Sequence, residues 1–216
     1  MTEQTLNLLI AMAIPLLFAI TIHEYAHGFV ADRLGDKTAR MLGRLSLNPL
    51  NHIDPFGTLI LPVSIAIISN GTMFFGFAKP VPISIHNFKN LRRDTILVTL
   101  AGPLSNFVMA LIWLGGLLLA TSIPDPAIQK SLLVVSLLGV KINIILGILN
   151  LLPIPPLDGS KIITVLMPRG ISTRIFEYEQ YGLLILVGLS ITGILAAIIG
   201  PLSSTTLGFY LSLIGK

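Results

Sequence analysis

Long runs of apolar residues dominate the pattern of this chain. Four of them, at 6–30, 95–121, 131–152 and 181–200, each cover 20 residues or more with few charges. About 20 residues of α-helix are needed to cross the roughly 30 Å of hydrocarbon in a bilayer. The pattern therefore predicts an all-α polytopic membrane protein with about four full transmembrane helices.

Two further apolar runs are shorter. The run 57–69 is interrupted by Pro62 and ends at Asn70, and the run 201–214 begins with a proline and carries hydroxyl side chains at 203–206. As a helix each run covers only about 20 Å, at about 1.5 Å per residue. We expect a short re-entrant insert at 57–69 and a short C-terminal apolar segment at 201–214. The sequence leaves open whether the C-terminal segment is re-entrant, interfacial or a short tilted helix.

The return of the insert has a different pattern. Met73, Phe75 and Phe77 occupy alternate positions, a spacing typical of a strand. We expect the segment 72–82 to be strand-like and to pair with 41–47, just before the insert. Strand backbone at membrane depth requires shielding by protein or a water-filled cavity.

Basic residues gather in three regions, at 33–44, 79–93 and 161–174, whereas the loop 122–130 has one lysine, at its end. Because Lys and Arg are enriched in cytoplasmic loops, we place the three basic regions in the cytoplasm and the N-terminus and loop 122–130 outside. This orientation requires an even number of crossings between residues 31 and 94, so we expect the insert to enter the membrane and return to the same side.

The composition favours a single membrane-embedded domain. Of the 216 residues, 53% are hydrophobic and 11% are charged, compared with about 25% charged in soluble proteins. The remaining length leaves no room for an appended soluble domain of about 100 residues. We expect one domain over 1–216, with a core at 6–165 and a C-terminal helical segment at 181–214.

The absence of cysteine and the net charge limit the kinds of site and partner that this chain can have. The chain has no cysteine, which excludes disulfides, thiol nucleophiles, iron–sulfur clusters and Cys-ligated zinc, so any metal must be held by His, Asp or Glu. The formal net charge of +4 is explained by the cytoplasmic loops of a membrane protein. No basic run contains interleaved aromatic residues, and we expect no nucleic-acid partner.

The strongest chemical signal lies late in the first apolar run, where the sequence reads His23-Glu24-Tyr25-Ala26-His27. On a helix the two histidines lie one turn apart on the same face and can bind one zinc ion, with Glu24 beside them as general base for a water molecule. The alternative is a pair of histidines hydrogen-bonded to neighbouring helices. Three ionisable groups within an apolar span cost about 2.5–3.5 kcal/mol each, and this cost favours the metal site.

A catalytic zinc needs a third protein ligand and leaves a fourth position to water. His52 and His86 are candidates by residue type, whereas Asp158 is favoured by depth. The third long apolar run ends in the cytoplasm, and three prolines within 153–156 forbid a helix immediately after it. The chain can therefore turn Asp158 back against the bundle at the level of His23.

Polar residues of two other runs lie at a similar depth. The segment 101–106, which ends at Asn106, is about 10–18 Å from the cytoplasmic end of its span, and Asn143 lies two turns before Asn150 on the same helical face. This convergence indicates an active site near the cytoplasmic face, with Asn106 and Asn143 either lining it or packing helices together. Lys141 either snorkels outward or faces a wet cavity.

The order of these segments resembles the site-2 protease family of intramembrane zinc metalloproteases. The resemblance rests on HEYAH in the first span, AGPLSN in a middle span and NLLPIPPLDG after the next, and it covers the whole core. It implies one zinc ion per chain, held by His23, His27 and Asp158, with Glu24 as the base that activates water. It also implies that Asn150 helps to position substrate or the developing oxyanion. The insert resembles the compact branch of the family, which lacks PDZ and CBS domains.

The sequence thus predicts a zinc-dependent intramembrane endopeptidase that hydrolyses membrane-spanning protein segments, integral to a prokaryotic cell membrane. Two alternatives stay open: a zinc-dependent membrane enzyme acting on another substrate, and a membrane transporter or channel for metal ions. Transport predicts polar residues through the whole membrane thickness. Here they crowd on the cytoplasmic side, and the outer halves of the first two long runs are almost wholly apolar.

Overall fold

The computed structural model describes residues 3–60, 79–168 and 180–215. Four helices in these ranges are long and apolar enough to cross a membrane: α1 (Glu3–Arg33, from Ile10 onward), α4 (Leu91–Ala120), α5 (Pro126–Leu151) and α9 (Ile194–Ser212). The described residues contain no strand. The prediction of an all-α polytopic membrane protein is confirmed.

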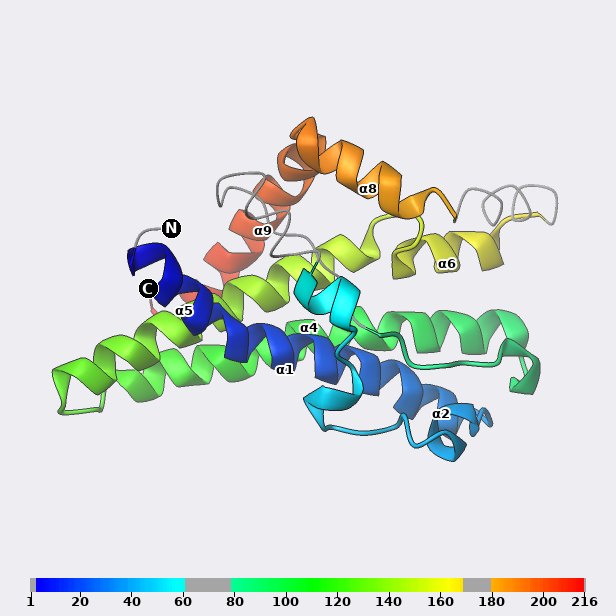
Figure 1. Cartoon of the computed structure of the whole chain (residues 1–216), viewed down its shortest axis with the longest axis horizontal. Coiled ribbons are helices and arrows are strands. Elements are labelled where there is room, and N and C mark those ends of the chain that lie inside the picture. The colour runs from blue at the N-terminus through cyan, green and yellow to red at the C-terminus, as the bar shows by residue number, and fades with distance from the viewer. Residues whose placement is uncertain (1–2, 61–78, 169–179, 216) are drawn as a thin grey trace.

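Shorter elements join the long helices (Figure 1). They are α2 (Thr38–Met41), the 3-10 helices η1 (Pro49–Asn51) and η3 (Ile85–Asn87), the π-helix η2 (Pro55–Ile60), α6 (Asp158–Leu166) and α8 (Gly182–Ile191). In Figure 1 the turn between α4 and α5 lies at the left end of the long axis, together with both termini. The elements α2 and α6 lie toward the right end.

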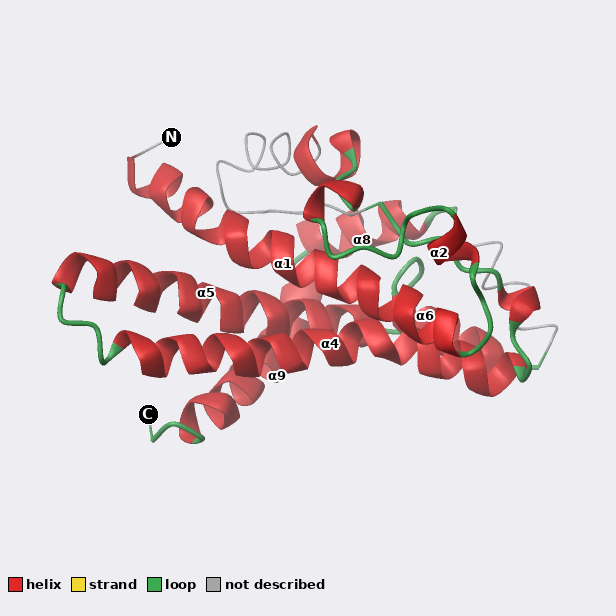
Figure 2. Ribbon diagram, turned by 90° about the horizontal axis from the view of Figure 1, so that it is seen from below, coloured by secondary structure: helices red, strands yellow, loops and turns green. Residues whose placement is uncertain are grey.

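Helices α4 and α5 form an antiparallel hairpin, and α1 packs against both (Figures 1 and 2). Glycines allow the close approach, because a Cβ at Gly147 would lie 3.0 Å from the Phe107 ring and one at Gly139 would overlap the Trp113 ring. Tyr210 of α9 joins this hairpin by donating its hydroxyl proton to the carbonyl of Phe107, at 3.1 Å. The buried core consists of Ala110, Leu114, Leu117, Val140, Ile144, Ile148 and Tyr210.

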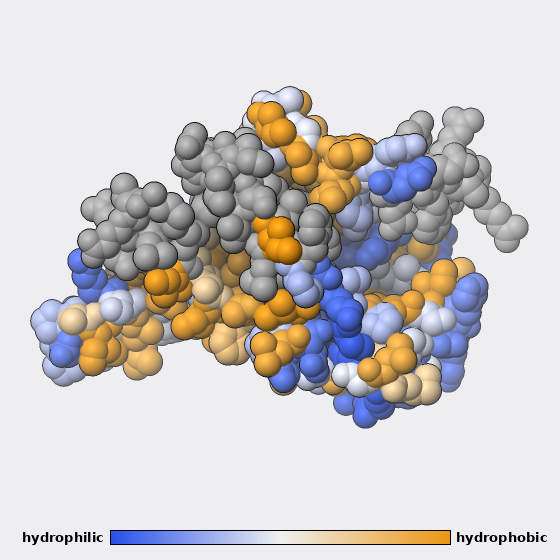
Figure 3. All heavy atoms as spheres, in the orientation of Figure 1, coloured by the Kyte–Doolittle hydropathy of each residue, from blue (hydrophilic) through white to orange (hydrophobic). Residues whose placement is uncertain are grey.

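The surface has the distribution that a bilayer requires. Figure 3 shows hydrophilic residues at both ends of the long axis and apolar residues over much of the stretch between them. Large apolar side chains of α4, such as Val108, Ile112 and Leu119, are exposed along its length. Because these side chains are exposed among the described residues, they suit contact with lipid.

The fourth span differs from the prediction. The sequence predicted one span over 181–200 and a separate segment at 201–214, whereas α8 ends at Ile191 and α9 continues through Pro201 to Ser212. Gly193 separates the two helices with a φ of 75°, a left-handed conformation that glycine adopts at low cost. Hydropathy does not register this break, because the helices on both sides are apolar.

The prediction of a strand at 41–47 is wrong. Helix α2 ends at Met41, and Gly43 follows with a φ of 64°. The amides of Arg44 and Leu45 then donate to the carbonyl of Ala39, at 2.8 and 3.2 Å. These groups close the end of α2 and are therefore unavailable to a strand ladder.

The segment 72–82, which was expected to pair with 41–47, also departs from the prediction in its described part. Residues 72–78 lie outside the described residues, and 79–82 is not a strand. Pro80 and Pro82 have no amide proton to give to a ladder. The two segments still meet, because the Arg44 guanidinium donates to the carbonyls of Lys79 and Pro80, at 3.1 and 3.3 Å.

The two ends of the insert lie together. The amide of Lys79 donates to the carbonyl of His52 at 3.0 Å. The expected apolar run 57–69 lies mostly outside the described residues, but the chain that leaves after His52 has returned to the same place at Lys79. This contact supports an insert that returns to the side from which it departs.

Asp36 holds the segment after the insert against the end of α1. Its buried carboxylate accepts hydrogen bonds from the Ser84 amide and the Asn87 side chain, each at 2.7 Å, and from the amide and hydroxyl of Thr38. Burial alone raises the pKa of Asp36, but these hydrogen bonds outweigh burial and lower it from the ordinary value. The contact is therefore strongest when Asp36 is ionised.

Candidate metal centre and active site

The two histidines of the first motif lie where the helix geometry predicts. His23 and His27 occupy successive turns on one face of α1, with ring centroids 4.6 Å apart, and both are buried. Their Nε2 atoms are 3.0 Å apart. The spacing of four residues brings the rings together because it is close to one helical turn.

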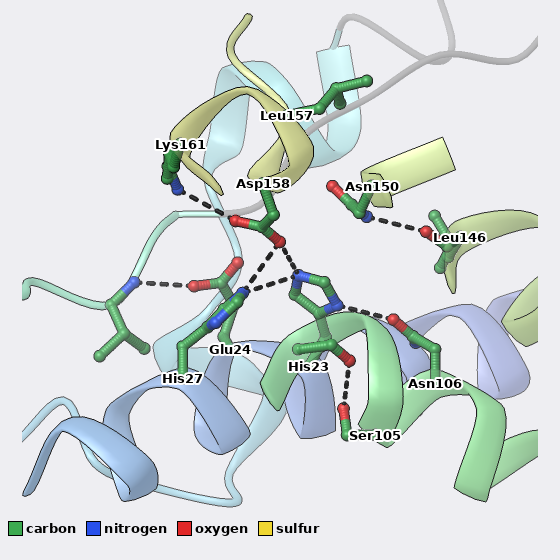
Figure 4. A network of polar contacts seen from close by, with 12 residues as sticks. His23, Glu24, His27, Ser105, Asn106, Leu146, Asn150, Leu157, Asp158 and Lys161 are labelled. Atoms are coloured by element: carbon green, nitrogen blue, oxygen red, sulfur yellow. Dashed lines mark hydrogen bonds and ion pairs between the residues drawn. The ribbon is translucent and has the colours of Figure 1, made fainter. Parts of the chain in front are cut away.

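Asp158 supplies the third group, as predicted. Its Oδ2 atom lies 3.2 Å from Nε2 of His23 and 3.1 Å from Nε2 of His27 (Figure 4). Tetrahedral ligands at about 2.0–2.1 Å from a zinc ion are roughly 3.3 Å from one another. The triangle of Nε2, Nε2 and Oδ2 atoms therefore has the dimensions of three zinc ligands, and these residues form a group able to hold a metal ion.

The other ring nitrogens are oriented so that Nε2 is free for a metal. Nδ1 of His27 lies 2.7 Å from the carbonyl oxygen of Val98, and Nδ1 of His23 lies 2.6 Å from Oδ1 of Asn106. Since both partners are acceptors, each Nδ1 carries the proton and each Nε2 presents a lone pair. Hydrogen bonds of this kind fix the tautomer and ring orientation of metal-ligating histidines.

A chain of amides extends from His23 into α5. Nδ2 of Asn106 donates to Oδ1 of Asn143 at 3.1 Å and to the carbonyl of Ala19 at 3.2 Å. Nδ2 of Asn143 donates to the carbonyl of Gly139 at 2.9 Å. Both asparagines are fully buried. They lie behind His23, and the contact with Asn106 orients the imidazole. A role of the two asparagines in substrate binding stays a prediction.

Gly102 of α4 makes room for the imidazoles. A Cβ at this position would overlap Nε2 and Cε1 of His27 and would lie 2.7 Å from Cε1 of His23. The glycine lets α4 approach the metal ligands themselves, and a larger residue would displace them.

The segment after α5 positions Asp158. Helix α5 ends at Leu151, and Asp158 begins α6 after the predicted proline-rich turn. Gly159 packs against the carbonyls of Leu151 and Leu152, where a Cβ would overlap the backbone. This close approach explains why a glycine follows the aspartate.

Lys161 was not identified from the sequence as a site residue. Its Nζ atom lies 3.1 Å from Oδ1 of Asp158, the carboxylate oxygen that does not face the histidines. An ammonium group at this distance favours the ionised form of Asp158, which is the form that binds a metal. The sequence signal that could have identified Lys161 is its position three residues, or about one helical turn, after Asp158.

Glu24 lies beside the three ligand residues, and a backbone amide from the segment after the insert holds its carboxylate. Its Oε2 atom accepts a hydrogen bond from the backbone amide of Val81 at 2.8 Å (Figure 4). Val81 packs closely on α1, because a Cβ at Gly28 would lie 2.9 Å from its Cγ1. Sequence reasoning missed this amide. Its signal is that Val81 stands between two prolines and carries the only amide proton of the three.

Asn150 flanks the centre from the end of α5. Figure 4 shows its side chain near Asp158, on the side away from Glu24. Its Nδ2 atom donates to the carbonyl of Leu146 at 3.0 Å. An amide nitrogen has two protons, so one remains for a substrate oxygen.

The alternative ligands lie elsewhere. His52 is buried and its Nε2 lies 2.8 Å from the carbonyl oxygen of Ser46, while His86 is exposed in η3. Neither belongs to the group formed by His23, His27 and Asp158. The donor set of two imidazoles and one carboxylate is typical of catalytic zinc sites.

Comparison with known proteins also indicates a zinc metalloprotease. The sequence model of "Peptidase family M50" matches residues 114–195. The chain is 36% identical over 200 residues to "Putative zinc metalloprotease YwhC" of Bacillus subtilis, covering 91% of this chain and 87% of that protein. It is 35% identical over 176 residues to "Putative zinc metalloprotease Rip2" of Mycolicibacterium smegmatis, covering 82% of this chain and 64% of that protein. No solved structure matches the chain. The motifs, their convergence and these similarities together show that the chain belongs to peptidase family M50, the site-2 protease family.

Proposed function

We propose that this protein is a zinc-dependent intramembrane endopeptidase that hydrolyses peptide bonds of membrane-spanning protein segments. One observation carries the proposal. His23 and His27 of the membrane-spanning helix α1 converge with Asp158 at the start of α6, with their ligand atoms 3.0–3.2 Å apart. Glu24 lies between the two histidines in the sequence of α1.

The residues divide the chemistry among them. A zinc ion bound to the three ligands would polarise the scissile carbonyl and acidify a water molecule. Glu24 takes the proton of that water and later delivers it to the departing amine. Asn150 donates a hydrogen bond to the carbonyl oxygen as it gains negative charge. A helix buries its peptide bonds in its own hydrogen bonds, so the substrate must unwind locally before attack.

The proposed site lies on the cytoplasmic side. His23 precedes the end of α1, Arg33, by ten positions, or about 15 Å. The same end of the bundle carries Arg40 of α2 and the two arginines in the first turn of α4, Arg92 and Arg93. Basic loops favour the cytoplasm, and the relatives reported above are bacterial. These observations support an integral protein of a prokaryotic membrane that acts on membrane-protein substrates.

Two measurements test the proposal. Purified protein should cleave members of a panel of transmembrane peptides in liposomes, and a zinc chelator should abolish cleavage. Glu24→Gln should retain about one zinc per chain and lose cleavage, because ligation needs the imidazoles and catalysis needs the base. Asp158→Ala should lose both zinc and cleavage. Cleavage by Glu24→Gln would refute the mechanism.

The same experiment separates the alternatives. A zinc enzyme for another substrate would cut no peptide of the panel, and a metal transporter would move zinc across the liposome membrane. Carboxylates of the described spans lie near the cytoplasmic end, at Glu24, Asp32 and Asp94. A transport pathway needs polar groups at every depth, so this distribution favours the peptidase.

A further inference from the structure

Lys141 lies in the middle of α5. It follows the first residue of the helix, Pro126, by 15 positions and precedes the last, Leu151, by 10, or about 22 Å and 15 Å along the axis. A lysine side chain reaches roughly 6 Å, so its ammonium group cannot reach either end of the helix. The side chain is exposed, and no residue of the described chain forms a hydrogen bond or ion pair with it.

Lys141 lines a groove between α5 and α9. Ile144 and Ile145 of α5 and Leu207 of α9 form its apolar lining, and Ser203 and Ser204 of α9 add two hydroxyls. Each hydroxyl donates its proton within α9, to the carbonyl of Gly200 at 3.0 Å or of Pro201 at 2.9 Å. Lys141 is therefore the one charged residue among the described residues that line this groove.

The groove is separate from the metal centre. Asn143, which faces the centre through Asn106, follows Lys141 by two positions. Two helical positions correspond to a rotation of about 200°. Lys141 thus points away from the side of α5 that supports the metal ligands, and a segment bound in the groove would not enter the catalytic site there.

The described spans offer no carboxylate to Lys141. Glu24 and Asp32 belong to α1 and Asp94 to the first turn of α4, whereas the groove is formed by α5 and α9. Each carboxylate also has a partner: the Val81 amide, Arg40 and Arg93 respectively. A second copy packed on the same groove would bring another lysine to that depth. An ammonium group in hydrocarbon without a partner is unfavourable, and a carboxylate from another protein would relieve this cost.

We propose that the α5–α9 groove docks a transmembrane helix of a partner protein that carries an Asp or Glu at mid-membrane. The partner's carboxylate pairs with Lys141, and its apolar side chains lie against Ile144, Ile145 and Leu207. The charge supplies selectivity, because a helix with a neutral residue at that depth leaves Lys141 unpaired. This docking surface goes beyond the proposed peptidase activity and does not require it.

The test uses the full-length Glu24→Gln variant in phosphatidylcholine liposomes, so that peptide cleavage plays no part in the result. The probe is a fluorescent leucine–alanine transmembrane peptide with one central Glu, and the matched probe has Gln in its place. Energy transfer to labelled protein should show at least tenfold tighter binding of the Glu probe. Lys141→Gln should remove this preference, whereas Lys130→Gln, at the outer end of α5, should retain it.

A charge exchange guards against a merely structural effect. Lys141→Glu should lose the Glu probe and bind a peptide with a central Lys. Every variant must retain about one zinc per chain as a sign of folding. Equal binding of the Glu and Gln probes, or an unchanged preference in Lys141→Gln, would overturn the proposal. Loss of Glu-probe binding when phosphatidylglycerol is added would also overturn it, because binding would then depend on the charge of the membrane surface rather than on an ion pair at mid-membrane.

Discussion

The carboxylate of Glu24 is held by the backbone amide of Val81, with a distance of 2.8 Å between Oε2 and the amide nitrogen. The two residues are 57 positions apart in the chain, and the insert lies between them. The bond fixes one carboxylate oxygen of the proposed base, so that the other remains available for a water molecule. The segment after the insert thereby becomes part of the catalytic arrangement.

This relationship predicts an effect of a backbone change at Val81. Val81→Pro removes the amide proton, and Val81→Ala keeps it while shortening the side chain. We expect kcat of Val81→Pro to fall by about 10-fold to 100-fold, because a misplaced base transfers protons less efficiently. Zinc content and kcat of both variants should be measured together. Full zinc and normal kcat in Val81→Pro would show that the bond does not position the base.

The amide behind His23 predicts a loss of metal affinity. Asn106→Ala removes the acceptor for Nδ1 of His23, and we expect zinc to bind about 10-fold to 100-fold more weakly. Competition with a fluorescent chelator measures this change. Asn106→Asp keeps an acceptor and should lose less. Ser105→Ala is the matched control, because that hydroxyl bonds only to the carbonyl of Gly102.

The packing of Gly102 predicts that one added methyl group disturbs the metal centre. Gly102→Ala places a Cβ onto the imidazoles of His23 and His27, whereas Gly115, on the same helix, has nothing within 4 Å of an added Cβ. We expect Gly102→Ala to lose most of its zinc and Gly115→Ala to keep it, as measured by metal analysis of purified protein. Equal zinc contents would mean that α4 moves aside without cost.

The environment of Asp36 predicts a pH effect on stability. Its pKa is lowered in the folded protein, so its contribution to stability is full above the unfolded pKa of about 3.9 and is lost as pH falls through the lower folded pKa. Asp36→Asn should therefore lower Tm by roughly 2–4 °C at pH 7. The difference between variant and wild type should shrink below about pH 4. A constant difference from pH 7 to pH 3 would contradict the role of the charge.

The contact between the ends of the insert predicts the membrane topology. Single cysteines at Lys37, Lys89 and Asp125 can be labelled without background, because the chain has no cysteine. An impermeant thiol reagent added from outside should label the Asp125 position only. Outside labelling at Lys89 would mean that the insert crosses the membrane, and it would place the start of α4 on the wrong side for its contacts with His27.

Much of the fold was predictable because two strong physical signals act locally. Apolar length identified α1, α4 and α5 to within a few residues at most ends. The H-E-x-x-H spacing placed His23 and His27 on one helical face. Asp158 was predictable from depth together with the family resemblance, because the prolines after α5 force the chain to turn.

The remaining features depend on conformations and distant contacts that residue patterns do not encode. The break between α8 and α9 depends on one left-handed glycine, Gly193, within a uniformly apolar stretch. The expected strand at 41–47 failed because its amides complete the end of α2. The Glu24–Val81 bond joins residues far apart in sequence, and neither residue alone indicates the other.

The hydrogen bond between the Lys79 amide and the His52 carbonyl brings the two ends of the insert together. Any sequence grafted between these two residues can therefore begin and end at the same place on the helix bundle. The entropic cost of a longer loop is small, at about 0.6 kcal/mol for each doubling. Exchanging the sequence between these two residues is therefore a direct test of whether the insert influences which peptides the proposed peptidase cleaves.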